Sequence, residues 1–180
     1  KCYIKIVCLT NQQRKENMTQ LQTTKESIYD YLTGGEGSAR IDCLARHLNL
    51  KHDPLHREIQ INSSLEDDSY DFKYKDAEYR VLTNKEADKE CKKYIRNSLW
   101  AFDSVFLENH SQKFSMDHFK KVQELYEDAN DLIYHMIDDF DYLVKDAIAT
   151  DGRGHFLGTY DHKENYEEWN REFFYIYRVN

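Results

Sequence analysis

The sequence predicts an α+β fold that is mainly helical, with one long amphipathic helix and a small antiparallel sheet that includes a C-terminal hairpin. The 180 residues contain a single proline and 32% charged residues, which favours helices over a turn-rich all-β fold. Apolar residues recur every three or four positions through residues 115–150, as on one face of a helix. Residues 172–179 instead alternate like a packed antiparallel strand, so both kinds of element are expected.

Length and composition suit one ordinary hydrophobic core. We expect an N-terminal appendage over residues 1–17 and a single domain over residues 18–180, with a helical part at 18–62 and helices plus the hairpin at 77–180. The four cysteines form no C-x-x-C pair and are typical of free thiols in a reducing cytoplasm. No apolar run approaches the roughly 18 residues that span a bilayer, so no membrane contact is expected.

Two helices are predicted in the N-terminal part. One begins near Thr24 and ends at the glycines of "GGEG"; Ser38 caps the next, "ARIDCLARHLNL". Two short helices joined by a glycine-rich turn resemble a helix-turn-helix regulator, but the second offers only Arg40, Arg46 and His47 to a DNA groove. A helical subdomain packed on the core is the favoured interpretation.

A strand followed by a capped helix is predicted next. "AEYRVLT" at 77–83 has strand character, and Thr83 with Glu86 forms a capping box for "NKEADKECKKYIRNSLWAF". The preceding "PLHREIQI" is ambiguous between helix and strand. The buried stripe of the capped helix is expected to consist of Ala87, Cys91, Tyr94 or Ile95, and Leu99.

The longest predicted element is a helix that Ser115 caps and that continues to about Thr150. A helix of about 35 residues would be about 52 Å long, which exceeds the width of a small domain. It must therefore break, near Asp138 and Asp139, or extend to a partner helix.

The segment "DGRGHFLGTYDH" at 151–162 contains three of the six glycines in the chain. Gly152 lies where a left-handed glycine would end the long helix, and Gly154 and Gly158 permit a tight turn after it. "HFLGTY" and "EFFYIYRV" then predict the two strands of the hairpin, joined by the acidic connector "DHKENYEEWNR".

This segment and the last residues, "FFYIYRVN", resemble the C-terminal signature of a family of small uncharacterised proteins carried by bacteria, phages and other mobile elements. "LTNKEADKE" at 82–90 is similar to an "LTDEEAD" segment of that family. The chain has His162 where the family pattern has a glycine. The resemblance covers about the last hundred residues and implies a setting in which counter-defence proteins are common. The matching positions are Asp151, Gly152, Arg153, Gly154, His155, Leu157, Tyr160, Asp161, Tyr175, Ile176, Tyr177, Arg178 and Asn180.

The 151–162 segment permits a catalytic and a structural interpretation. In a nuclease or other hydrolase, His155 would act as a general base oriented by Asp151 or Asp161 while Arg153 stabilised a phosphate-like transition state; alternatively, His155, Asp161 and His162 would hold a divalent ion. In the structural interpretation, which we favour, Arg153 pairs with Asp161 or Asp151 and His155 binds a carbonyl at the helix end.

No metal or cofactor is expected. His47, His52 and His56 lie four to five residues apart around Pro54, but no cysteine or second histidine pair completes a tetrahedral set. Surface histidines are the simpler interpretation.

Acidic residues concentrate in the C-terminal third. The net charge is −8, and residues 115–180 contain 15 acidic and seven basic residues, which accounts for all of it. Eight carboxylates lie between Glu127 and Asp151, about one per 4.7 Å of helix, close to the charge spacing along a DNA strand. The candidate binding residues are Glu127, Asp128, Asp131, Asp138, Asp139, Asp141, Tyr160 and Trp169.

The preferred function is a non-enzymatic, protein-binding inhibitor from a phage or mobile element, of the anti-CRISPR or antirestriction type. Its expected partner is a host protein or nucleoprotein complex with a basic groove, in the cytoplasm of the host bacterial cell. Direct nucleic-acid binding is not expected from so acidic a chain, and the sequence is compatible with a homodimer. The alternative is the small nuclease or hydrolase that uses the 151–162 segment.

Overall fold

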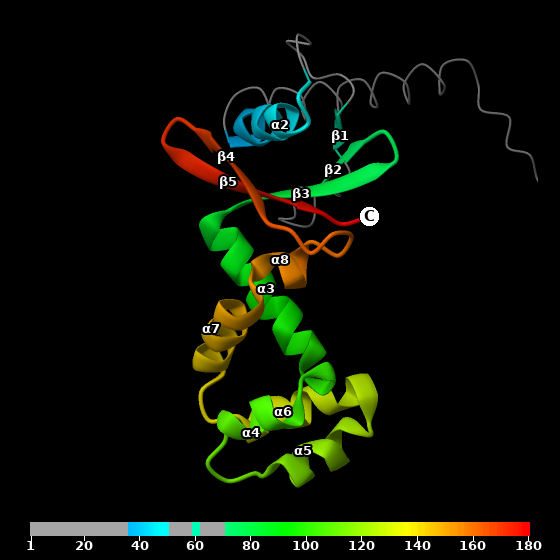
Figure 1. Cartoon of the computed structure of the whole chain (residues 1–180), viewed down its shortest axis with the longest axis vertical. Coiled ribbons are helices and arrows are strands. Elements are labelled where there is room, and N and C mark those ends of the chain that lie inside the picture. The colour runs from blue at the N-terminus through cyan, green and yellow to red at the C-terminus, as the bar shows by residue number, and fades with distance from the viewer. Residues whose placement is uncertain (1–35, 51–58, 62–70) are drawn as a thin grey trace, which may run out of the picture. The chain divides into compact units, whose positions relative to one another are not determined.

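The computed structural model describes residues 36–50, 59–61 and 71–180, and the α+β fold class is confirmed (Figure 1). The chain divides into two compact units, residues 1–41 and 42–180. The predicted boundary after residue 17 and the helix predicted from Thr24 lie outside the described residues.

The sheet has five antiparallel strands in the order β1-β2-β3-β5-β4. They are β1 (Ile59–Ile61), β2 (Asp71–Tyr74), β3 (Ala77–Thr83), β4 (Asn165–Trp169) and β5 (Glu172–Arg178). Strand β5 pairs with β3, and Val81 lies opposite Ile176. The sheet therefore joins the end of the chain to the β2–β3 hairpin, about a hundred residues earlier in the sequence. Strand β1 lies within the part predicted as helical and resolves the end of "PLHREIQI" as a strand.

The strand and capping box at residues 77–86 are confirmed. Strand β3 leads directly into α3 (Asn84–Ser98), where the Thr83 hydroxyl accepts from the Glu86 N–H and the Glu86 carboxylate accepts from the Thr83 N–H. The stripe of Ala87, Cys91 and Ile95 is fully buried, and Leu99 continues it into a short 3-10 helix, η1 (Leu99–Ala101). Tyr94, the alternative to Ile95, is exposed.

The C-terminal hairpin is confirmed, but its first strand was misplaced. "HFLGTY" was predicted as a strand, whereas residues 153–157 form the helix α8 (Arg153–Leu157). The predicted connector instead contains β4, which pairs with β5. Asn170 and Arg171, with φ of 51° and 70°, make the two-residue turn between them, and such turns suit the twist of a hairpin.

The region predicted as one long helix is divided into shorter ones. It comprises α5 (Met116–Gln123), the 3-10 helix η2 (Tyr126–Asp128), α6 (Ala129–Met136) and α7 (Phe140–Asp151). The expected break at Asp138 and Asp139 is confirmed: Asp139 is extended and caps α7 by accepting from the Tyr142 N–H at 3.0 Å. The second break, after Gln123, allows successive apolar stretches to pack around one core instead of along a rod.

The core lies around α3, which packs against β3, β5, α6, α7 and α8, while α4 (Ser104–Asn109) packs against α5 (Figure 1). Its fully buried side chains come from every one of these helical segments and from the sheet. Within the described residues, no helix is long and apolar enough to cross a membrane.

The helix predicted to follow an N-cap at Ser38 begins earlier: α2 spans Glu36–His47, so Ser38 lies inside the helix and the predicted cap is wrong. In its part within the second unit, Cys43, Leu44 and Ala45 are buried. Arg46 donates to the Glu168 carbonyl of β4, and His47 makes an edge contact with Tyr79 of β3. Of the three residues considered for a DNA groove, Arg46 and His47 therefore contact the sheet, and Arg40 is buried.

Candidate functional site

Gly152 connects α7 to α8 in a conformation that favours glycine. Its φ is 77°, and its N–H donates to the Ile148 carbonyl at 2.8 Å, so the predicted positive φ at the end of α7 is confirmed. Its ψ of 155° is extended instead of left-handed helical. This combination is essentially restricted to glycine and lets α8 begin one residue after α7 ends.

The other two glycines of the segment allow close backbone approach. A Cβ built on Gly154 would lie 2.7 Å from backbone atoms of His162, Lys163 and Glu164, and one on Gly158 would lie 2.8 Å from the Lys163 carbonyl oxygen. The return of the chain from α8 towards β4 therefore passes directly over these two glycines. Their role is packing, and neither position has a positive φ.

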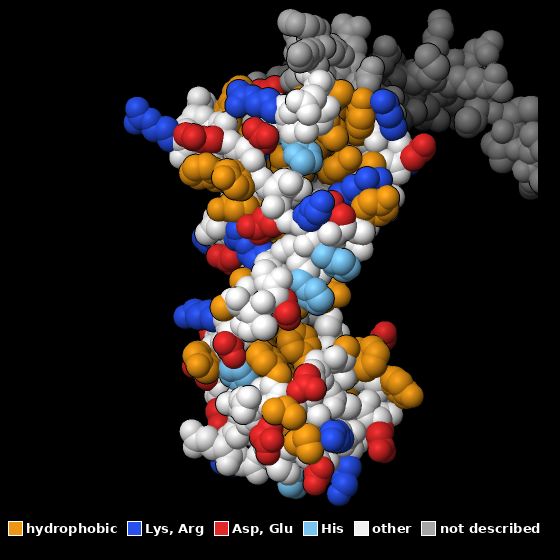
Figure 2. Space-filling view, viewed as in Figure 1, with side chains coloured by type: hydrophobic (Ala, Val, Ile, Leu, Met, Phe, Trp, Pro, Cys, Tyr) orange, Lys and Arg blue, Asp and Glu red, His pale blue; other side chains and the backbone are white. Residues whose placement is uncertain are grey.

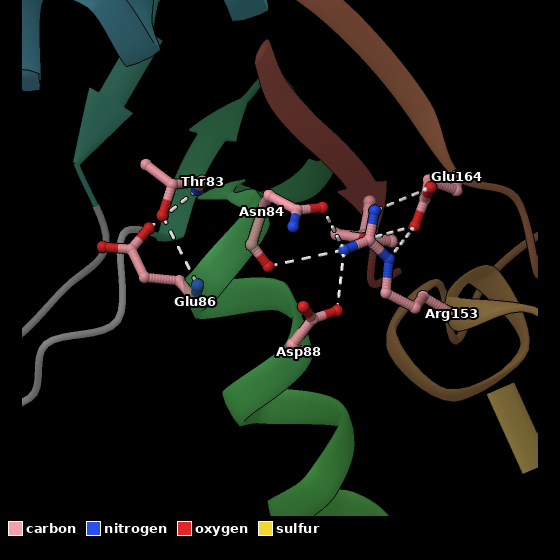
Figure 3. Close-up of polar contacts among 7 residues, drawn as sticks. Thr83, Asn84, Glu86, Asp88, Arg153 and Glu164 are labelled. Carbon is pink, nitrogen blue, oxygen red and sulfur yellow. Dashed lines mark hydrogen bonds and ion pairs between the residues drawn. The ribbon is translucent and has the colours of Figure 1, made fainter. Parts of the chain in front are cut away.

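Arg153 is the centre of a polar cluster that joins α8, α3 and the hairpin (Figure 3). Its Nε and Nη2 donate to the two carboxylate oxygens of Glu164 at 2.8 and 3.0 Å. Its Nη1 donates to the Asn84 side chain at 2.9 Å and pairs with Asp88 at 3.0 Å. The guanidinium carbon lies 4.2 Å from the centre of the Tyr175 ring. We call these five residues the Arg153 cluster.

The electrostatics of the Arg153 cluster favour the ion pair. Burial works to lower the pKa of Arg153, but the hydrogen bonds that it donates to Glu164 and the charges of the neighbouring Tyr177 and Glu164 raise its pKa overall. Tyr177 is fully buried and donates to Glu164 at 2.6 Å. Burial, followed by this bond to an anion, raises its pKa well above the usual range, so its hydroxyl stays a donor.

The donors of Arg153 are engaged inside the protein. Its side chain is only 10% exposed, and bidentate pairing with Glu164 matches the planar shape of both groups. The expected pairing with Asp151 or Asp161 is wrong: Arg153 pairs with Glu164 and Asp88. A guanidinium held in this way is suited to fixing α8 on the sheet, and it offers little to a phosphate group.

The remaining candidate catalytic residues do not converge. His155 is exposed, with its ring 5.1 Å from that of Phe156 and 5.5 Å from that of His162. Asp161 accepts from the Lys163 N–H at 3.1 Å, which fixes the turn after α8, and Asp151 is exposed at the end of α7. Among the described residues, no carboxylate orients His155 and no backbone carbonyl accepts from it.

The candidate metal-binding histidines form two separate sets. His155 and His162 lie together, but within the described ranges no three His, Cys, Asp or Glu side chains form a group that could hold a metal ion. Of the other set, His47 contacts Tyr79, while His52 and His56 lie outside the described residues.

Four of the six candidate acidic residues make contacts within the protein. Asp131 pairs with Arg96 at 2.5 Å, and Asp141 pairs with Lys92. Asp138 accepts from the Gln112 N–H, and Asp139 caps α7. The hydrogen bond and charge of Lys92 lower the pKa of Asp141. These carboxylates therefore support the packing of α3, α6 and α7.

Glu127 and Asp128 differ from those four carboxylates. Both are exposed in η2, and neither has an ion pair or side-chain hydrogen bond with another described residue. Because the predicted rod is broken at two places, the eight carboxylates do not lie along one straight helix. The acidic region is consequently a set of short segments with different neighbours.

The hairpin carries exposed aromatic side chains. Tyr166 of β4 is 63% exposed and Phe173 of β5 is 45% exposed, with their rings 5.8 Å apart. Glu168 lies directly opposite Phe173, so it shares their face of the sheet. We call Tyr166, Glu168 and Phe173 the hairpin surface. Figure 2 shows hydrophobic and acidic side chains side by side over this part of the molecule.

The two aromatic candidates from the sequence contact arginines. The guanidinium carbon of Arg178 lies 3.7 Å from the centre of the Tyr160 ring, and that of Arg46 lies 4.8 Å from the Trp169 ring. Tyr160 remains exposed, whereas Trp169 is half-buried. Trp169 therefore holds α2 against β4, and Tyr160 retains a face for contact.

Sequence reasoning missed Glu164, Asn84 and Asp88. Glu164 was placed in a connector, and the other two appeared only as polar positions in the first turn of a helix. Their contacts with Arg153 span 11 to 69 residues along the chain. No local sequence pattern predicts such contacts. The one available signal is Glu164 itself, a carboxylate that follows shortly after the glycine-rich segment containing Arg153.

Cys91 lies in the core beside the Arg153 cluster and should be unreactive in the folded protein. Burial raises its pKa from 9.0 to about 12, so the thiolate that attacks alkylating reagents is suppressed at pH 8. Above pH 9 the Cys91 thiol loses its proton in the unfolded chain but keeps it in the folded chain. The free energy of unfolding should therefore fall as the pH rises from 9 towards 12. Iodoacetamide labelling followed by peptide mapping should modify Cys91 only in denaturant. Rapid labelling of Cys91 in the native protein would contradict its burial.

The polar groups of the Arg153 cluster thus find their hydrogen-bond partners within the protein, whereas the hairpin surface is open to solvent. Comparisons with protein-family models, with curated proteins and with solved structures found no match to this chain.

Proposed function

We propose that the protein is a non-enzymatic inhibitor that binds a host nucleic-acid-processing complex, of the CRISPR-effector or restriction-enzyme class, through its hairpin surface. The observation that carries the proposal is the exposed, mutually contacting pair Tyr166 and Phe173 beside Glu168. The internal pairing of Arg153 supports a binding role over a hydrolytic one.

The chemistry of the hairpin surface suits a basic partner. Aromatic side chains are enriched among the residues that dominate binding energy, and their faces attract arginine and lysine. Glu167, Glu168 and Glu172 add negative charge to the same hairpin. A protein groove built to hold nucleic acid supplies the complementary cations.

The acidic helical residues have a secondary part in this proposal. Glu127 and Asp128 have no partners among the described residues, and they add to the field that attracts a basic groove. Asp131, Asp138, Asp139 and Asp141 contact neighbouring elements and are poor choices for a binding test, because their removal also breaks contacts within the protein.

The hairpin surface is tested in a reconstituted cleavage assay with purified CRISPR effectors and restriction enzymes. The parent protein should inhibit at least one of them, with apparent affinity that falls as salt rises because exposed charges are screened. Tyr166→Ser and Phe173→Ser should each weaken inhibition by about 30-fold or more, as expected for central aromatic contacts.

Three controls accompany this assay. Tyr142→Ser removes an equally exposed tyrosine outside the hairpin and should inhibit like the parent, as should His155→Ala. The double variant Glu127→Gln, Asp128→Asn measures the helical carboxylates. Full inhibition by both hairpin variants would place the contact elsewhere, and nucleic-acid cleavage by the protein itself, lost in His155→Ala, would support the hydrolase instead.

A further inference from the structure

A cavity of about 450 Å³ lies between α3, α8, the middle of β3 and the residue that follows β5. None of its lining residues belongs to the hairpin surface. Glu90, Tyr94 and Asn97 recur at helical spacing on the side of α3 next to its buried stripe. Phe156 and Leu157 of α8 are nearly fully buried and form the apolar part. Its volume falls within the range of small-molecule sites.

The third side of the cavity is built by the chain after α8. The Thr159 hydroxyl donates to the Val179 carbonyl at 2.6 Å, and the Tyr160 N–H donates to the Arg178 carbonyl. Arg80 of β3 is held by two bonds to Asp71, at 2.8 and 3.2 Å. Hydrogen bonds therefore fix both Arg80 of β3 and the segment after α8, and Arg153 fixes α8 itself. The cavity is consequently pre-formed.

The lining combines aromatic and cationic groups. Tyr94 lines the cavity and is 43% exposed, and its ring lies 6.0 Å from that of Phe156. Three charged side chains line the cavity: Arg80, whose charge is paired with Asp71, and the oppositely charged Lys93 and Glu90. The Lys93 ammonium is exposed and has no ion pair among the described residues.

From this arrangement we propose that the cavity binds a small aromatic anion, with the ring against Tyr94, Phe156 and Leu157 and the negative group beside Lys93. An exposed ammonium on the rim of an apolar recess attracts a carboxylate, sulfonate or phosphate, while the recess takes the ring out of water. This site is independent of the partner-binding role, since it uses no residue of the hairpin surface.

The probe for this site is anilinonaphthalene sulfonate, an aromatic anion whose fluorescence rises in apolar surroundings. Titration of the folded parent protein should give saturable binding of one molecule. Lys93→Glu should weaken the affinity by about three- to tenfold, since an attraction typical of an exposed ion pair is replaced by repulsion. Tyr94→Ser should weaken it by a similar factor through loss of the aromatic contact.

Two matched variants make the result decisive. Lys85→Glu changes the net charge by the same amount on the same helix, but lies outside the lining, and it should leave the affinity unchanged. Tyr166→Ser removes an exposed tyrosine of the hairpin and should also leave it unchanged. Absence of saturable binding, equal weakening by Lys85→Glu and Lys93→Glu, or loss of binding in Tyr166→Ser would each overturn the proposal. None of these outcomes depends on inhibition of a partner.

Discussion

Replacing Gly154 with alanine should destabilise the fold by about 3 kcal/mol or more, because the new Cβ would meet rigid backbone and no flexible side chain that could move aside. The three nearest atoms, from His162, Lys163 and Glu164, all lie 2.7 Å from the position of that Cβ. This steric clash could be relieved only if the backbone of residues 162–164 shifted away from α8. Glu164, the main partner of Arg153, would then move as well. Urea unfolding followed by circular dichroism measures the loss.

Gly152 provides the comparison for this variant. A Cβ there meets nothing within 4 Å, so Gly152→Ala should cost only the strain of its φ of 77°, about 1–3 kcal/mol. Gly152→Val should cost more, because a β-branched side chain restricts the backbone further. A Gly154→Ala protein as stable as the parent would mean that the chain does not pass so closely over α8.

The elements predicted correctly are those with strong local signals. The capping box at Thr83 and Glu86 and the buried stripe of α3 are encoded within a few residues, and the alternation in β5 marks a strand in itself. The helix break at Asp139 could be predicted because a helix of that length cannot fit a small core.

The elements predicted wrongly depend on contacts distant in sequence. "HFLGTY" has residues compatible with a strand, yet Phe156 and Leu157 lie in the short helix α8, which buries both side chains in the core. The strand that pairs with β5 is β4, which follows this segment. The partners of Arg153 were also misassigned, because nearby aspartates were preferred to Asp88 and Glu164. Only the tertiary arrangement brings those carboxylates to the guanidinium.

Replacing Arg153 with methionine should destabilise the protein by about 2–3 kcal/mol, below the 3–5 kcal/mol of a fully buried pair because Glu164 is 28% exposed. Methionine keeps much of the side-chain length and removes the donors. Glu164 would then keep Tyr177 as a partner but lose two charged hydrogen bonds, and Asp88 would lose its cation. Chemical unfolding gives the free energy, and Arg153→Lys should recover only part of it, since an ammonium cannot bind both oxygens in the same plane.

Arg178→Met is the matched control, because Arg178 also stacks on a tyrosine, Tyr160, but has no Asp or Glu partner among the described residues; its Nε donates to the Asn180 backbone oxygen at 2.7 Å. Its cost should stay within about 1 kcal/mol, the range for an exposed cation–π contact. The difference between the two variants therefore isolates the ion pairs of the Arg153 cluster from the stacking. If Arg153→Met and Arg178→Met were equally stable, the pairing with Glu164 would contribute no net stability, and Arg153 would again be available for a role in binding or catalysis. If Arg153→Met is unstable and still inhibits the partner when folded, Arg153 acts in stability alone, and the hairpin surface carries the binding.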